Sequence, residues 1–218
     1  MNLSAMIPPT QLNDGSAPNE AWVPLFIKGI LANTVEQIDA NIEAALKRDY
    51  IPFNDIIGTK SGAVAIVGSG PSLKKNWKRL RNFKGDIIAC NSAFGFLLDK
   101  GITPQYMLCF DADILMLPFM KAHEKVTYLL ASRCPPEAFD IVKDCKIVCW
   151  HAAGDENLDN LLGKYNRKEP MVLGGSAAVT RALYVAITMG YGMVHMYGVD
   201  SSYEGTNTHI SQSRTEER

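Results

Sequence analysis

The sequence predicts an α/β fold, a three-layer Rossmann-like domain built on a mainly parallel sheet. From residue 63 to residue 199, short apolar runs alternate with segments of helical spacing, as in strand–helix–strand units. Two of these runs break directly into glycine-rich turns. The 218 residues are enough for one sizeable core. We therefore expect an N-terminal arm over 1–31, a helix and connector over 32–60, and the Rossmann-like domain over 61–218.

The composition excludes several classes of protein. Hydrophobic residues make up 47% of the chain, charged residues 21%, and the net charge is −1. No global charge therefore draws the chain to nucleic acid, and no apolar stretch approaches the roughly 20 residues that span a bilayer. The start lacks the basic and apolar regions of a signal peptide. We expect a cytoplasmic protein that binds neither membranes nor nucleic acid. Whether the chain forms a homo-oligomer is left open.

Cysteine usage agrees with a reducing compartment. The number of cysteines is odd, at five, and none forms a C-x-x-C pair. Cys90, Cys109 and Cys149 fall in apolar runs that we expect to be buried strands. Reduced thiols in the core are therefore favoured over disulfides or zinc ligands.

The segments before the sheet differ from the rest of the chain. Prolines at 8, 9, 18 and 24 stand among polar residues, which predicts an arm rather than a domain. From Asn33 to Lys47 apolar residues fall at helical spacing, which predicts an amphipathic helix capped by Asn33 or Thr34. Six strands are then expected, over 63–67, 86–90, 105–110, 126–131, 146–150 and 193–199.

The first glycine turn follows the strand at 63–67 and reads GSGPSL. Gly68 and Gly70 permit a tight turn, and Pro71 suits the first position of a helix. Free backbone N–H groups at such a helix start can bind a phosphate. The turn lacks the third glycine of a dinucleotide fingerprint and the Gly-Lys pair of a P-loop. From these residues alone, phosphate binding and a plain tight turn both stay open.

A second glycine turn follows the apolar run at 171–173. Gly174, Gly175 and Ser176 precede a helix of small residues that should end at Gly190. One reading gives the two glycines only a packing role, so that the helix lies close to the sheet. The other reading is a second helix start aimed at an anionic ligand.

Polar residues follow most of the expected strands. Because ligands of parallel sheets bind beyond the carboxyl ends of the strands, these residues should converge on one site. They are Gly68–Ser72, Asn91 and Ser92, Asp111 and Asp113, His151, and Asp200–Tyr203. A switch point between the first strand and its neighbour would place the crevice over Gly68–Ser72.

Two features near this edge allow both a functional and a structural reading. Asp111 and Asp113 resemble an Asp-x-Asp pair that holds Mg²⁺ or Mn²⁺ against a diphosphate, because alternate residues of a strand face the same way. One aspartate could instead cap the next helix.

Lys74–Lys84 holds six basic residues and no acidic one. A solvated helix face explains this run, and attraction of a polyphosphate or nucleic acid is the alternative.

Several of these segments together resemble the MptE-like 6-hydroxymethylpterin diphosphokinase family. They are VAIVGSGPSL, ACNSA, a strand ending in FDAD, and GGSAAVTRALYVAITMGYGMVHMYGVDSSY. The family takes in the motility-associated flagellin glycosylation factors (Maf), and its domain is remotely similar to bacterial sialyltransferases. Compact relatives also occur in phage genomes, so the chain is similar to a phage-encoded member. The likeness runs from Gly62 to His209.

The resemblance implies a nucleotide-binding domain and assigns positions in it. Gly68, Gly70, Pro71 and Ser72 match the phosphate loop. Asn91, Asp111, Gly175, Ser176 and Asp200 match further site positions. With the strand-end residues, the cofactor-binding candidates are Gly68, Ser69, Gly70, Pro71, Ser72, Asn91, Ser92, Gly174, Gly175, Ser176, Ser202 and Tyr203. Asp111 and Asp113 are the metal candidates, and Asp200 and His209 are the catalytic candidates.

Three functions stay open. The first is an ATP- and magnesium-dependent diphosphokinase, in which helix starts at Pro71 and Ser176 hold phosphates and Asp200 orients a hydroxymethylpterin-like acceptor. The second is a glycosyltransferase that uses a nucleotide sugar, with His151 or His209 as base or acid. The third is a non-enzymatic phage protein that retains the fold. Gly70→Val is expected to abolish nucleotide binding without unfolding the protein.

Overall fold

The computed structural model describes residues 4–7, 23–26 and 33–200. The chain divides into two compact units, residues 1–32 and 33–218. In the first, strands β1 (Ser4–Ile7) and β2 (Val23–Phe26) pair in antiparallel register. This pairing was not predicted, because Pro24 looks like a strand breaker. A two-stranded ribbon tolerates it, since an edge strand need not donate every N–H group to a neighbour.

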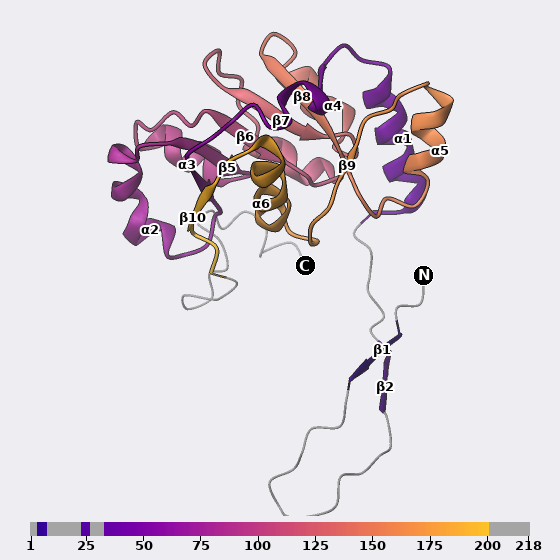
Figure 1. Cartoon of the computed structure of the whole chain (residues 1–218), viewed down its shortest axis with the longest axis horizontal. Coiled ribbons are helices and arrows are strands. Elements are labelled where there is room, and N and C mark those ends of the chain that lie inside the picture. The colour runs from indigo at the N-terminus through magenta and orange to yellow at the C-terminus, as the bar shows by residue number, and fades with distance from the viewer. Residues whose placement is uncertain (1–3, 8–22, 27–32, 201–218) are drawn as a thin grey trace, which may run out of the picture. The chain divides into compact units, whose positions relative to one another are not determined.

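The second unit is built on one parallel sheet (Figure 1). Its strands are β3 (Ile51–Pro52), β4 (Ala63–Val67), β5 (Asp86–Cys90), β6 (Tyr106–Cys109), β7 (Thr127–Ala131), β8 (Lys146–Ala152), β9 (Met171–Val172) and β10 (Met193–Tyr197). Their order is β10-β4-β5-β6-β7-β8-β3, with β9 beside β8, and every pair is parallel. The predicted fold class is confirmed.

The strand order reverses at β4. Successive strands from β5 to β8 extend to one side of β4, whereas β10 returns to its other side. This confirms the predicted switch point beside the first strand of the domain, where ligands of open α/β sheets bind. The loop after β4 therefore lies at the position where the topology opens a crevice.

Helices pack around this sheet (Figure 1). They are α1 (Val35–Leu46), α2 (Leu73–Asn76), α3 (Ala93–Asp99), α4 (Pro136–Ile141), α5 (Leu158–Lys164) and α6 (Ala178–Met189). Thr34 caps α1, since its side chain accepts a 3.2 Å hydrogen bond from the Gln37 amide. Helix α6 packs on β4, β5 and β6, and it ends at Gly190 with φ +108°, as predicted. The helix closest to the switch point is therefore α6.

Two predicted helix starts are wrong. The segment after Pro71 forms only one α-helical turn, α2, and continues as the 3₁₀ helix η2 (Trp77–Asn82). The apolar residues Trp77, Leu80 and Phe83 repeat every three residues, which suits the three-residue turn of a 3₁₀ helix. Helix α6 begins at Ala178, not at Ser176. Two further 3₁₀ helices, η1 (Phe53–Ile56) and η3 (Ile114–Phe119), follow β3 and β6.

The core lies around the central strands, whose side chains are buried on both faces. Trp150 and Tyr128 are its largest fully buried side chains. Cys90, Cys109 and Cys149 are buried in β5, β6 and β8 as predicted, and all five cysteines are free thiols. Burial raises the pKa of Cys90 to about 12, so this thiol stays protonated and unreactive.

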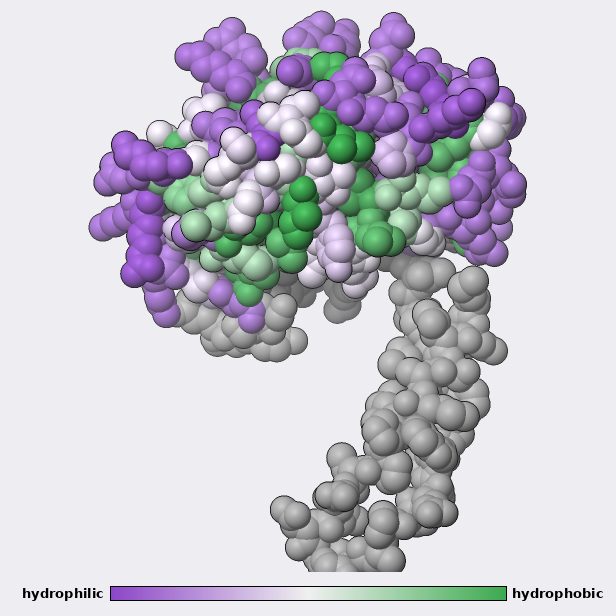
Figure 2. Space-filling view, viewed as in Figure 1, coloured by the Kyte–Doolittle hydropathy of each residue, from purple (hydrophilic) through white to green (hydrophobic). Residues whose placement is uncertain are grey.

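Apolar side chains also reach the surface near β10. Tyr184 and Ile187 of α6 are 42% and 55% exposed, and Met193 and Met196 of β10 are 58% and 46% exposed. Figure 2 shows apolar surface in the region that α6 occupies in Figure 1. The outer edge of β10 pairs with no strand among the described residues. No helix in the described part is long and apolar enough to cross a bilayer.

Candidate functional site

The loop after β4 is tied to the end of β10. The Gly68 amide donates to the Tyr197 carbonyl and the Gly70 amide to the Gly198 carbonyl, both at 2.8 Å. A Cβ atom on Gly70 would come within 2.7 Å of the Gly198 oxygen, a contact that real Cβ atoms essentially never make. The two glycines therefore serve the close approach of two backbone segments.

Asp200 completes this attachment. Its Oδ2 accepts a 2.7 Å hydrogen bond from the Ser72 amide, and its Oδ1 accepts from the Ser72 hydroxyl. The predicted role of Asp200 was to orient an acceptor. In the structure its carboxylate instead fixes the loop, since it binds the amide and hydroxyl that were expected to hold a phosphate.

The loop after β4 therefore has few backbone N–H groups left to bind a phosphate. Pro71 carries no N–H group, and the Leu73 amide donates to the Gly70 carbonyl. Of the five amides from Gly68 to Leu73, only that of Ser69 makes no hydrogen bond within the described residues. A valine side chain at position 70 would press on the Gly198 backbone, so we now expect Gly70→Val to destabilise the fold as well as to affect binding.

The first turn of helix α6 has backbone N–H groups without a hydrogen bond, which the loop after β4 mostly lacks. Its N-cap residue is Ala177, which has no side-chain oxygen for the first-turn amides. The amides of Ala178 and Val179 make no hydrogen bond within the described residues. They line a cavity of about 220 Å³, which we call the loop cavity. Its walls are Gly68, Ser69, Gly70, Cys90, Asn91, Ala177, Ala178, Val179, Gly198, Val199 and Asp200.

A second cavity of about 330 Å³ adjoins the first. We call it the asparagine cavity, and its walls are Asn33, Asn91, Phe110, Asp111, Ala112, Arg133, Ser176, Ala177 and Ala178. The two cavities share Asn91, Ala177 and Ala178. They therefore meet directly beyond β5, at the start of α6.

Asn91 stands at this junction in an unusual state. Its φ is +46°, a left-handed conformation that asparagine adopts more readily than most residues other than glycine. Its Oδ1 is buried without a hydrogen-bond partner among the described residues, which costs free energy. A buried polar atom without a partner needs an explanation, and a functional role at a cavity junction is one.

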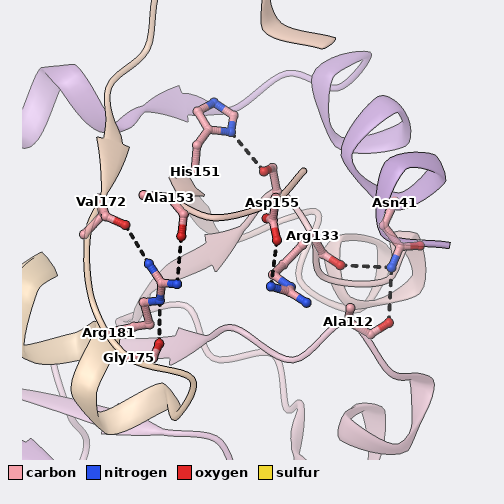
Figure 3. A network of polar contacts seen from close by, with 10 residues as sticks. Asn41, Ala112, Arg133, His151, Ala153, Asp155, Val172, Gly175 and Arg181 are labelled. Atoms are coloured by element: carbon pink, nitrogen blue, oxygen red, sulfur yellow. Dashed lines mark hydrogen bonds and ion pairs between the residues drawn. The ribbon is translucent and has the colours of Figure 1, made fainter. Parts of the chain in front are cut away.

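Two arginines lie against the Phe110 ring on the wall of the asparagine cavity, and Figure 3 shows their polar contacts. The guanidinium carbons of Arg133 and Arg181 lie 4.8 and 4.9 Å from the centre of the Phe110 ring. Arg133 also pairs with Asp155 at 2.7 Å. Burial raises the pKa of Asp155, and the guanidinium of Arg133 acts against this rise. Arg133 lines the cavity, and its Nε is buried without a hydrogen-bond partner among the described residues.

Arg181 holds the second glycine turn in place. Its guanidinium donates to the carbonyls of Val172, Gly175 and Ala153 at 2.8, 2.8 and 2.9 Å, as Figure 3 shows. Only 7% of Arg181 is exposed, and burial lowers its pKa. One side chain thus joins the turn before α6 to the ends of β8 and β9, which positions the α6 amides at the cavities.

The two metal candidates have different positions. Both follow the end of β6 rather than standing on it, so strand alternation does not align them. The Asp113 carboxylate accepts from the Leu115 amide at 2.9 Å and caps η3, the structural alternative. Asp111 lines the asparagine cavity and accepts from the Asp113 amide at 3.3 Å. The described residues hold no group of three or more His, Cys, Asp or Glu side chains around a metal-sized site.

His151 is fully buried and cannot be the base or acid of a transfer reaction. Its ring nitrogens bond Ser132 at 2.9 Å and Glu169 at 3.0 Å. Burial raises the pKa of Glu169, but His151, together with Tyr50 and Arg167, outweighs burial and leaves that pKa below its usual value. His151 and Glu169 are therefore joined by a buried hydrogen bond with a structural role.

The structure brings together part of the predicted set. Gly68, Ser69, Gly70, Asn91 and Asp200 line the loop cavity, and Asn91, Asp111 and Ser176 line the asparagine cavity. The candidates that line neither are Pro71, Ser72, Ser92, Asp113, Gly174 and Gly175. Ser202, Tyr203 and His209 lie outside the described residues.

Sequence reasoning missed three side chains of the site. Arg133 comes shortly after β7. It could have been found by examining the residues that follow this strand, as was done for the other strands. Arg181 is the one charged residue of α6, a helix otherwise dominated by small and apolar residues. Asn33 was considered only as a helix cap, a role that Thr34 takes.

Comparison with solved structures shows a similar fold. The chain is similar to the Maf glycosyltransferase from Magnetospirillum magneticum AMB-1, with a TM-score of 0.58 and 16% identity over 79% of this chain and 28% of that one. It thus spans under a third of that protein. A mammalian sialyltransferase in complex with Gal-beta-1-3GalNAc-ortho-nitrophenol gives a TM-score of 0.45 and 11% identity, over 84% of this chain and 71% of that one.

No curated protein matches the sequence significantly. Residues 36–206 match the family described as 6-hydroxymethylpterin diphosphokinase MptE-like, a family named for a transferase. The matched range contains every strand of the parallel sheet and nearly all residues of both cavities. The chain therefore belongs to the MptE-like family.

Proposed function

We propose that this chain is a nucleotide-dependent transferase domain, with the donor phosphates in the loop cavity and the second substrate in the asparagine cavity. The observation that carries this proposal is Asn91. It lines both cavities, its backbone is left-handed, and its buried Oδ1 has no partner among the described residues. A group transferred between two substrates has to pass through such a junction.

The donor end is built from backbone amides. The amides of Ala178 and Val179 lie at the positive end of α6, and they and the Ser69 amide make no hydrogen bond within the described residues; all three residues line the loop cavity. Asp200 and Arg181 keep the loop and the turn fixed, so these donors need no reorganisation when a phosphate binds.

The finer proposal is diphosphate transfer from ATP to a hydroxymethylpterin-like acceptor, which family membership supports. The acceptor oxygen forms a bond to the β-phosphorus, and the bond from that phosphorus to the bridging α,β oxygen breaks. AMP leaves with the bridging oxygen, and the hydroxyl proton passes to water. Asn91 lines both cavities, and its side-chain amide would orient the attacking hydroxyl.

The proposed reaction also uses a divalent cation, which would have one protein carboxylate as a ligand instead of the two that the sequence predicted. Asp111 and the phosphate oxygens would hold Mg²⁺ or Mn²⁺, which commonly binds through one carboxylate and substrate phosphates. Such an ion would neutralise phosphate charge. Asp113 would take no part while its carboxylate caps η3.

Glycosyl transfer from a nucleotide sugar is the second candidate. Asn33, Asn91 and Arg133 line the asparagine cavity, and amide and guanidinium side chains suit sugar hydroxyls as well as a pterin. His209, outside the described residues, is then the candidate base or acid.

Product analysis separates the two reactions. The purified protein is incubated with 6-hydroxymethylpterin, Mg²⁺ and ATP, and AMP is followed by chromatography. Pterin-dependent AMP release supports diphosphate transfer. Stabilisation by CMP or UDP but not by ATP in a thermal shift assay, with no AMP release, supports glycosyl transfer. If no nucleotide stabilises the protein, both proposals fail and a non-enzymatic protein that retains the fold is favoured.

A further inference from the structure

The stretch from Lys74 to Lys84 concentrates positive charge on one part of the surface. It holds six basic side chains and no acidic one, in a chain whose net charge is −1. All six are exposed, and Figure 2 shows strongly hydrophilic surface where Figure 1 shows α2, the helix in which the stretch begins. We call these six residues the basic strip: Lys74, Lys75, Lys78, Arg79, Arg81 and Lys84.

The 3₁₀ helix η2 separates the cations of the strip from its apolar residues. Leu80 is buried, and Trp77 and Phe83 are half-buried and pack against the core. Because a 3₁₀ helix repeats every three residues, Lys78 and Arg81 lie one above the other, about 6 Å apart along its axis. The strip therefore presents cations to solvent while its large apolar side chains face the sheet.

The fold does not neutralise most of this charge. Four members of the strip form no ion pair within the described residues, namely Lys74, Lys78, Arg79 and Lys84. The guanidinium of Arg81 lies 4.9 Å from the centre of the Trp77 ring, and the Nζ of Lys100 lies 5.6 Å from it. Lys100, at the end of α3, thus adds a further cation beside the strip. A bound polyanion would relieve the repulsion among these charges.

The length and composition of the strip favour a long anion of regular charge. Lys74 and Lys84 are joined by a helical path of roughly 15–20 Å. Exposed charges more than about 8 Å apart are largely screened at physiological salt, so a single nucleotide would not engage both ends. A membrane is disfavoured, because a helix that lies on a bilayer inserts its apolar face. An acidic protein is disfavoured, because protein interfaces have apolar centres and few lysines.

We propose that the basic strip binds the phosphate backbone of a nucleic acid without reading its sequence. A phosphodiester strand repeats one negative charge every few ångström, so it can meet successive cations of the strip. Contacts to phosphates position a nucleic acid but carry no sequence information. The expectation that the chain does not bind nucleic acid came from its net charge, which averages over this local concentration. The interaction goes beyond the proposed transferase function and does not depend on it.

The test measures the fluorescence anisotropy of labelled probes titrated with the full chain. The probes are a DNA duplex of about 20 base pairs and single strands of DNA and of RNA of the same length. We expect the wild type to bind with micromolar affinity at about 50 mM NaCl. Four phosphate contacts would make duplex binding roughly 100-fold weaker at about 200 mM NaCl. The probe that binds most tightly identifies the kind of backbone that the strip prefers.

Two triple variants separate the strip from the overall charge. The strip variant is Lys78→Gln/Arg79→Gln/Lys84→Gln. The matched control is Lys125→Gln/Lys143→Gln/Lys146→Gln. All six residues are exposed without an ion pair within the described residues, so both variants should give the circular dichroism spectrum of the wild type. The strip variant should bind about tenfold or more weakly at low salt, with a salt slope smaller by about three. The control should stay within about twofold of the wild type.

Three results would overturn the inference. The first is the failure of the wild type to bind any of the nucleic-acid probes at low salt, a measurement that needs no variant. The second is an equal loss of affinity in both triple variants, which would show that binding follows net charge alone. The third is binding to phosphatidylserine vesicles without binding to nucleic acid, which would assign the strip to a membrane surface. None of these results alters the proposed function, which is tested by nucleotide binding and AMP release.

Discussion

Removal of the Arg181 side chain should destabilise the protein more than any other single change at the site. Its guanidinium makes one fully buried and two partly buried hydrogen bonds to backbone carbonyls. Losing a buried charged bond costs about 1.5–3 kcal/mol, and each of the others costs about 1 kcal/mol. The like charge of Arg133 across the Phe110 ring offsets part of this. We expect Arg181→Met to lower the free energy of unfolding by about 3–5 kcal/mol.

Urea unfolding followed by circular dichroism measures this loss. Arg181→Lys is the matched control, because it keeps the charge but its ammonium cannot reach three carbonyls on different segments. It should lose most of the same stability. If Arg181→Met or Arg181→Lys unfolds within about 0.5 kcal/mol of the wild type, the hydrogen bonds do not hold the turn and the reasoning fails.

Three further predictions concern the loop after β4 and the buried ion pair. Asp200→Asn should cost about 1–3 kcal/mol in urea unfolding, because an amide cannot accept from both groups of Ser72, and unchanged stability would contradict this. Gly70→Ala should destabilise by about 1–3 kcal/mol, whereas Gly163→Ala, which meets no atom within 4 Å, should not. The folded-state pKa of Glu169 is lowered, so its stabilisation is present above about pH 4.3 and is lost as pH falls through that pKa. Glu169→Gln should therefore show a weaker decrease in melting temperature from pH 5 to pH 3, and a parallel decrease would exclude this contribution.

Most strands and their parallel arrangement could be predicted because the pattern is local and strong, whereas the order of the strands in the sheet could not. Residues 63–67 and 86–90 are apolar runs that match β4 and β5 to the residue. The two-residue strands β3 and β9 were not predicted as strands, because such short pairings depend on a neighbouring strand rather than on local sequence. The 3₁₀ helix η2 was missed since spacings of three and four residues are hard to separate in a short segment.

The site was predicted at the correct edge of the sheet, but the roles of single residues were not. Reading the residues after strands found Asn91 and Asp111, both of which line cavities. It could not show that Asp200 binds the Ser72 amide, because that contact joins residues 128 positions apart. The state of Asn33 depends equally on long-range packing, since an unpartnered oxygen is visible only once its surroundings are known.

The central claim is that the two cavities form one substrate site around Asn91. The most direct test is nucleotide affinity in Asn91→Gly, measured by calorimetry with ATP, CMP and UDP against the wild type. Glycine accepts φ +46° without strain, so stability should stay within about 1 kcal/mol while the amide is lost. The account predicts a folded variant whose affinity for the best nucleotide falls about tenfold or more. A folded Asn91→Gly variant with wild-type affinity would contradict it.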